Sequence, residues 1–194
     1  YKGRSIRNIL ASKTNSLFYW GNEPDAKKPV VILVCGYPYF KPFYDRFVER
    51  LKDDYSFFIF ESFLECFKDK EQICTNDLLD YYGKVIKAKL PGKEIYAVIG
   101  HCLGGELGML LAEHLRMHGH PSIKALIIEG FIRRDKSLLI PITSGNQLLQ
   151  KYSKITNAII ESMPQLAFGG EMIVCLATKA PSRFMFETEQ PDSD

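Results

Sequence analysis

Short apolar runs alternate along this chain with longer segments in which apolar residues recur at helical spacing. The runs Val-Val-Ile-Leu-Val at 30–34 and Ala-Leu-Ile-Ile at 125–128 are apolar at every position. Such runs are typical of strands that helices cover on both faces, so we predict two central strands of a mostly parallel sheet. The alternation of strands with helices indicates an α/β fold.

The same pattern gives bounds for the remaining elements. Strands are predicted at 16–20, 30–35, 57–61, 95–99, 123–128 and 172–177, and helices at 43–51, 76–89, 103–118 and 147–163. No repeat or long linker divides the chain, so we expect one domain over 1–194. In parallel sheets flanked by helices, ligands bind beyond the carboxyl ends of the strands, here the residues after Cys35, Ile99 and Ile128.

Composition narrows the classes of function. The 194 residues carry 25 Lys and Arg against 23 Asp and Glu, a net charge of +2 that lacks the basic excess of a nucleic-acid-binding domain. No apolar run is long enough to span a membrane and no secretory signal opens the chain, so we expect no membrane partner. The five cysteines are an odd set without C-x-x-C spacing, which favours reduced thiols, a cytoplasmic location and no metal site.

One short motif has the residue types and spacing of a catalytic turn. Gly100, Cys102 and Gly104 form G-x-C-x-G between a predicted strand and a predicted helix. This is the pattern of a nucleophile elbow, in which glycines two residues before and after the nucleophile remove side chains that would collide in the tight turn. The helix N-terminus would favour a thiolate and stabilise an oxyanion, with the backbone N–H of Leu103 as one donor. Cys102 as a small apolar residue in a glycine-rich turn remains the alternative.

The motif Val-Ile-Gly-His-Cys-Leu-Gly-Gly at 98–105, with Leu-Leu-Ala-Glu-His-Leu at 110–115, resembles the thioesterase domains of nonribosomal-peptide and polyketide synthases. The resemblance extends through 30–37, 44–51 and 124–131, and covers about three quarters of the chain. That family usually has Ser where this chain has Cys102. The resemblance implies an α/β-hydrolase fold: a mostly parallel central sheet flanked by helices, here with a short lid insertion at about 131–170.

The resemblance also implies the partners of the nucleophile. It places the triad carboxylate directly after the strand that follows the nucleophile helix, at Glu129, although the family more often has Asp there. It places the second oxyanion donor at the backbone N–H of Tyr37. A solvated Glu129 at a strand end is the alternative.

The histidine base is missing from its expected place. In this fold it follows the acid along the chain, yet His101, His114, His118 and His120 all precede Glu129. We expect that this sequence stops short of a C-terminal segment carrying the base and that the domain is cut from a larger synthase. The alternative is a domain that has lost its base.

These observations predict a thioesterase that takes an acyl or peptidyl chain from the phosphopantetheine thioester of a carrier protein, in the same polypeptide, onto Cys102. Release would follow by hydrolysis, cyclisation or aminolysis, with no metal, nucleotide or other cofactor. A cysteine introduced in place of serine to trap an intermediate would give the same sequence. The alternatives are an inactive acyl-binding or docking module, a stand-alone editing thioesterase, and a carboxylester hydrolase.

Overall fold

The computed structural model describes residues 18–36, 44–61, 73–128, 147–164 and 168–175. The strands are β1 (Phe18–Trp20), β2 (Val30–Val34), β3 (Ser56–Phe60), β4 (Ile95–His101), β5 (Lys124–Ile128) and β6 (Met172–Cys175). The helices are α2 (Asp45–Leu51), α4 (Thr75–Lys89), α5 (Leu103–Met117) and α6 (Gln147–Ser162). Each falls within two residues of its predicted bounds, apart from the predicted residues 16, 17, 43, 176 and 177, which lie outside the described ranges.

The strands form one sheet in the order β1-β3-β2-β4-β5-β6. β3, β2, β4, β5 and β6 run parallel, and β1 pairs antiparallel with β3 at the edge. β4 runs two residues further than predicted, because Gly100 and His101 continue the ladder opposite Ile127 and Ile128. The predicted mostly parallel α/β sheet is confirmed, and β2 and β5 both lie inside it.

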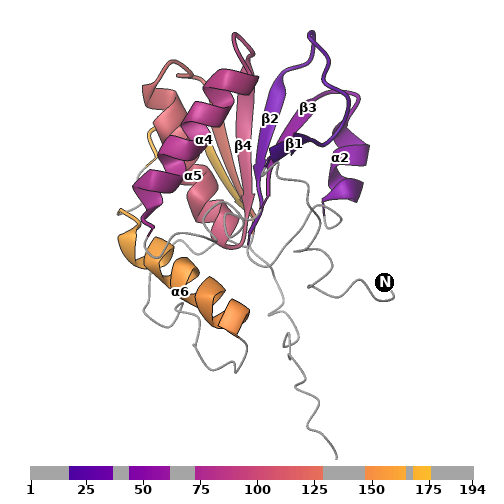
Figure 1. Cartoon of the computed structure of the whole chain (residues 1–194). Helices are drawn as coiled ribbons and strands as arrows, with labels where there is room; N and C mark the ends of the chain where they lie inside the picture. The colour runs from indigo at the N-terminus through magenta and orange to yellow at the C-terminus, as the bar shows by residue number, and fades with distance from the viewer. Residues whose placement is uncertain (1–17, 37–43, 62–72, 129–146, 165–167, 176–194) are drawn as a thin grey trace, which may run out of the picture.

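The sheet separates two apolar cores. Along β2, Val30, Ile32 and Val34 face one core while Val31 and Leu33 face the other, and all five are buried. Figure 1 shows α4 and α5 on the first face and α2 on the second. The interpretation of β2 as a strand covered on both faces is therefore correct.

The same prediction for 125–128 is only half correct. Ala125 and Ile127 are buried, whereas Leu126 and Ile128 are half-buried. Among the described helices only α2 lies on their face, and it lies over the β1–β3 side of the sheet (Figure 1). The apolar run at 125–128 thus correctly predicted a strand inside the sheet, but it did not show that helices bury both faces of that strand.

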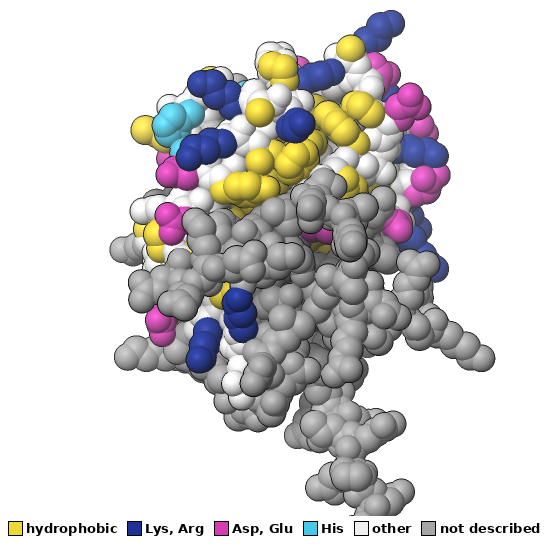
Figure 2. Space-filling view, viewed as in Figure 1, with side chains coloured by type: hydrophobic (Ala, Val, Ile, Leu, Met, Phe, Trp, Pro, Cys, Tyr) yellow, Lys and Arg dark blue, Asp and Glu magenta, His cyan; other side chains and the backbone are white. Residues whose placement is uncertain are grey.

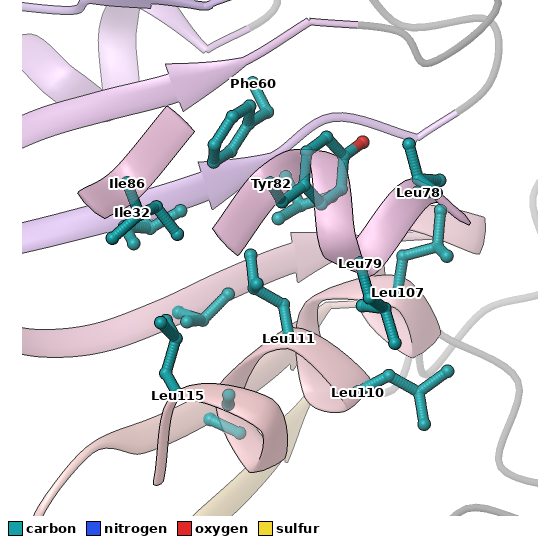
Figure 3. Close-up of a cluster of buried hydrophobic side chains, with 14 of the residues drawn as sticks. Ile32, Phe60, Leu78, Leu79, Tyr82, Ile86, Leu107, Leu110, Leu111 and Leu115 are labelled. Atoms are coloured by element: carbon teal, nitrogen blue, oxygen red, sulfur yellow. The ribbon is translucent and has the colours of Figure 1, made fainter. Parts of the chain in front are cut away.

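The larger core joins α4 and α5 to the sheet, as Figure 3 shows. The Tyr82 ring of α4 lies 4.2 Å, centroid to centroid, from Phe60 of β3, and both residues are buried. Leu107 and Leu111 of α5 are fully buried in the same cluster. Burying each leucine contributes about 1.5–3 kcal/mol, so this face holds α5, and the turn before it, firmly on the sheet.

Helix α6 belongs to the predicted lid at 131–170, of which 131–146 and 165–167 lie outside the described residues. Its buried Ile155 and Ile159 join the larger core. At its end, the Ser162 hydroxyl accepts a 2.8 Å hydrogen bond from the Thr75 N–H of α4. Thr75 Oγ1 in turn donates to the Ile159 carbonyl at 2.9 Å. α6 is thus fixed to the N-terminus of α4 by packing and by hydrogen bonds.

None of the described helices combines the length and the apolar character that crossing a membrane requires.

Candidate active site

The turn between β4 and α5 has a strained backbone at one residue. Cys102 adopts φ 55° and ψ −129°, and it alone among the described non-glycine residues has a positive φ. Such a conformation costs on the order of 1–3 kcal/mol and persists only where the surroundings impose it. The turn is thus held in the geometry that the elbow motif predicts, with Cys102 partly exposed at its apex.

Two glycines make this turn possible by close approach. A Cβ on Gly100 would lie 2.6 Å from the Cα of Gly105 and closer still to the Gly104 carbonyl oxygen. A Cβ on Gly104 would lie 2.8 Å from the Cys35 carbonyl carbon and would overlap the Val34 carbonyl oxygen. Since real Cβ atoms do not approach backbone this closely, only glycine fits at either position.

The turn is tied to both neighbouring strands. The Cys102 N–H donates to the Ile128 carbonyl of β5 at 2.9 Å, and the Gly105 N–H donates to the Cys102 carbonyl at 2.8 Å. On the other side, the buried Gly36, which comes two residues after β2, lies close to the turn. A Cβ on Gly36 would be 3.2 Å from the Cys102 Cβ. Cys102 therefore stands between the carboxyl ends of β2 and β5.

The predicted partners of Cys102 divide between described and undescribed residues. Leu103 is the first residue of α5, so its N–H is one of the first-turn amides that have no acceptor within the helix. Tyr37 and Glu129 lie outside the described residues, directly after Gly36 and Ile128. The structure therefore places the residue before each of them beside Cys102, and their roles stay predictions.

All four histidines lie within the described residues. The His101 Nδ1 lies 3.4 Å from the Tyr44 hydroxyl, and the two rings meet edge to face. His114 in the last turn of α5 and His118, the residue directly after the helix, stack on each other at 4.3 Å between centroids. Burial, followed by the nearby His118, lowers the pKa of His114. His120 lies in the loop after α5, so the three later histidines are at the far end of the helix from Cys102.

Sequence reasoning missed the polar cluster beside the elbow. The buried Cys35 thiol, at the end of β2, shares a hydrogen bond with the Tyr44 hydroxyl. Burial, and then the Glu61 carboxylate, raise the pKa of Cys35, while the Tyr44 contact opposes them. Burial is also the main cause that raises the pKa of Tyr19, with Cys35 next. The only sequence signal was position, because Cys35 and Glu61 both follow strand ends at the edge where sites form.

Within the described ranges, no group of three or more His, Cys, Asp or Glu side chains is arranged to hold a metal ion. The predicted absence of a metal or cofactor remains a prediction.

The sheet order, the parallel strands and the strained turn after β4 together define an α/β-hydrolase fold. Solved structures with this fold superpose on the chain at low sequence identity. The NocB thioesterase domain of the nocardicin cluster, in covalent complex with a fluorophosphonate nocardicin G analogue, matches with a TM-score of 0.63 and 13% identity. The match covers 83% of this chain and 77% of that one.

Two further structures support the same fold. The type II thioesterase BorB of the borrelidin biosynthetic cluster has a TM-score of 0.61 and 12% identity, with 83% of this chain and 88% of that one covered. An α/β-hydrolase enzyme from the metagenome of sediments from the lagoon of Mar Chica, Morocco, has a TM-score of 0.55 and 13% identity, over 81% and 70%. No protein-family model and no curated protein matches the sequence.

Proposed function

We propose that this domain is a thioesterase that receives an acyl or peptidyl chain from a carrier-protein phosphopantetheine thioester and releases it by hydrolysis, cyclisation or aminolysis. The observation that carries the proposal is the strained Cys102 backbone between Gly100 and Gly104, at the start of α5. Strain of this kind is stored where a reactive side chain must be presented. The thioesterases NocB and BorB have the same fold, which supports the choice of substrate class.

In the proposed reaction, the Cys102 thiolate attacks the carbonyl carbon of the pantetheine thioester. The carbonyl oxygen becomes an oxyanion, stabilised by the backbone N–H groups of Leu103 and Tyr37. Collapse breaks the carbon–sulfur bond to pantetheine, which leaves as its thiolate and takes up the proton that Cys102 gave to the general base, and a thioester remains on Cys102. Water or an amine then attacks that thioester and restores the thiol. Glu129 would orient the general base, which we do not assign to any of the four histidines. The proposed reaction needs no cofactor, and the cytoplasmic location expected from the sequence is part of the same proposal.

Intact-protein mass spectrometry after brief exposure to butyryl-pantetheine tests the first step. We expect one butyryl adduct, mapped to Cys102 by proteolysis, and none on Cys102→Ala. Cys175 is exposed and would react on its own, so the comparison uses a Cys175→Ser background. Absence of the adduct, or an equal adduct on Cys102→Ala, would refute the proposal.

The positions of the histidines favour a second candidate, an acyl-binding module without turnover. Such a module would bind butyryl-pantetheine without releasing pantetheine, or would form the Cys102 adduct once and keep it. Release of pantetheine beyond one equivalent, followed with a thiol reagent, distinguishes the thioesterase from this module.

A further inference from the structure

Both described ends of the stretch between β2 and α2 meet at one residue, His101. At one end, the backbone of Gly36 packs on the backbone of His101, since a Cβ on Gly36 would lie 3.3 Å from the His101 carbonyl carbon. At the other end, the buried Tyr44 places its hydroxyl 3.4 Å from His101 Nδ1. The Tyr44 and His101 rings also pack edge to face, with centroids 6.2 Å apart.

The chemistry of the Tyr44 and His101 side chains indicates which atom donates. The Tyr44 hydroxyl lies 3.4 Å from His101 Nδ1, and the roles of the two atoms depend on the histidine tautomer. A phenol O–H is a stronger donor than an imidazole N–H, and an unprotonated imidazole nitrogen is a stronger acceptor than a phenol oxygen. The favoured arrangement therefore has the Tyr44 hydroxyl donating to Nδ1. The His101 proton is then on Nε2.

We propose that His101 and Tyr44 are positioning residues that fix Gly36 and the start of α2, the two described ends of this stretch, to the nucleophile turn. Tyr37 is bonded to Gly36, so in this proposal the anchoring of Gly36 sets the distance from the Tyr37 amide, the proposed second oxyanion donor, to Cys102. The inference rests on the proposed function. It gives His101 a role other than that of general base, because its Nδ1 is engaged by Tyr44 and its backbone supports Gly36.

The test compares two reactions of the same thiol. Acylation of Cys102 by butyryl-pantetheine passes through an oxyanion, whereas alkylation by iodoacetamide is a displacement that needs no oxyanion donor. In Tyr44→Phe, which keeps the ring packing and loses the hydroxyl, we expect acylation at saturating thioester to slow by about tenfold or more. We expect the alkylation rate of Cys102 to stay within about twofold, because the turn around Cys102 itself is unchanged.

Tyr55→Phe is the matched control. Tyr55 packs on Phe57 and Tyr96 on the same face of the sheet, at the opposite end of β3 from the site, so both rates should stay at the wild-type value. If Tyr44→Phe slows both reactions equally, or neither, the positioning role is wrong. Only the selective loss of acylation supports it.

A second measurement is independent of activity. The ¹⁵N shifts of the His101 ring should show a protonated Nε2 and an acceptor Nδ1 in the wild type, and a mixture of tautomers in Tyr44→Phe. Unchanged shifts would overturn the hydrogen bond. If the wild type gives no Cys102 adduct, the proposed function fails, and with it the expected effect of the pair on acylation. The shifts then still decide whether Tyr44 orients His101.

Discussion

Gly104 and Gly108 lie one turn apart on α5, yet they meet different surroundings. A Cβ on Gly104 would overlap the backbone at the end of β2, whereas a Cβ on Gly108 would lie 3.4 Å from Gly100 and Val98. The first distance cannot be relieved without separating α5 from the sheet. The second is ordinary van der Waals contact.

We therefore expect opposite results from the same substitution. Gly104→Ala should destabilise the protein by about 3 kcal/mol or more and abolish acylation, because backbone must shift. Gly108→Ala should be neutral or stabilise by up to about 1 kcal/mol, since alanine is the better helix former. Urea unfolding followed by fluorescence of Trp20, the only tryptophan, gives both values. Equal effects would mean that the close approach of Gly104 to β2 is wrong.

The cysteine at position 102 has its own expected consequence. Exchange of one thioester for another is nearly thermoneutral, so the Cys102 intermediate stays activated toward amines, whereas an ester on serine is less reactive. We expect Cys102→Ser to lower the ratio of aminolysis to hydrolysis when butyryl-pantetheine is offered with a primary amine. Product ratios by mass spectrometry test this, and an unchanged ratio would contradict it.

Among single residues, the sequence was enough to predict those that the geometry of the turn requires to be glycine. Gly100 and Gly104 could be predicted because the motif leaves no room for a side chain there. The contact of Tyr44 with His101 could not, because it joins two segments that are remote in sequence, and nothing local marks such a contact.

Among the elements, α4 and α6 are held together by a small buried polar cluster. Thr75 is fully buried with both its N–H and its hydroxyl bonded to α6. Thr156 of α6 is also fully buried, but its hydroxyl has no hydrogen-bond partner among the residues that the structure describes. The two threonines thus offer a matched comparison.

Replacement of each by valine should shift stability in opposite directions. Thr75→Val removes a donor from the Ile159 carbonyl and should cost about 1–2 kcal/mol. Thr156→Val removes a hydroxyl buried without a partner and should be neutral or stabilise by about 1 kcal/mol. Urea midpoints measure both. Destabilisation by Thr156→Val would show that its hydroxyl does have a partner.

A second contact between elements, made by Glu113, should contribute to stability in a way that depends on pH. Glu113 of α5 accepts two hydrogen bonds from Arg116, at 2.7 and 2.9 Å, and one from the Gly169 N–H before β6, at 3.1 Å. The Arg116 contact, followed by the Gly169 amide, lowers the pKa of Glu113 from 4.5 to about 2. Because the folded-state pKa is depressed, the stabilisation is complete above the unfolded value and is lost as the pH falls toward 2.

We therefore expect Glu113→Gln to be less stable than the wild type at pH 7, with a difference that narrows steadily between about pH 5 and pH 2. Unfolding curves across this range test it. Glu49→Gln is the control, because the exposed Glu49–Lys52 pair is screened by solvent and should contribute little to stability at any pH. A Glu113 difference that stays constant down to pH 2 would contradict the contact with Gly169 and Arg116.

Element bounds were predictable wherever one local pattern decides them, as in α4 and α5, whose apolar stripes face the core. The extension of β4 to His101 was not predictable, because it depends on pairing with β5. The half-exposed face of β5 was missed for a similar reason. An apolar run shows that a segment can be buried on both sides, and the position of helices far along the chain decides whether it is.

Across the whole molecule, Figure 2 shows hydrophobic side chains gathered over the strands beside α4. The half-buried residues that pack on the larger core include Phe18 and Trp20 of β1 and Tyr81 and Val85 of α4. Lys89 lies over the Phe18 ring, 5.7 Å from its centroid. A long charged side chain can cover apolar surface in this way while its amine stays in water.

The overall architecture was the most predictable level, since the order of strands and helices in the sequence restricts the sheet to few arrangements. The assembled site was less so, because its parts follow three strands that meet only in the folded sheet. Sequence patterns identified the turn around Cys102. The predicted partners Tyr37 and Glu129 came only from the resemblance to a known family.

The position of β4 between β2 and β5 also has a kinetic consequence. Val30 of β2 pairs with Ile95 of β4. Forming this pair closes a long loop, so the chain loses conformational entropy before the contact stabilises it. β2 can pair earlier with β3, which is nearer in sequence. Cys102 is held in its unfavourable backbone only after β4 has inserted between its neighbours. We infer that the nucleophile turn forms late in folding, and that a partly folded chain already holding β2 and β3 together still lacks its reactive centre.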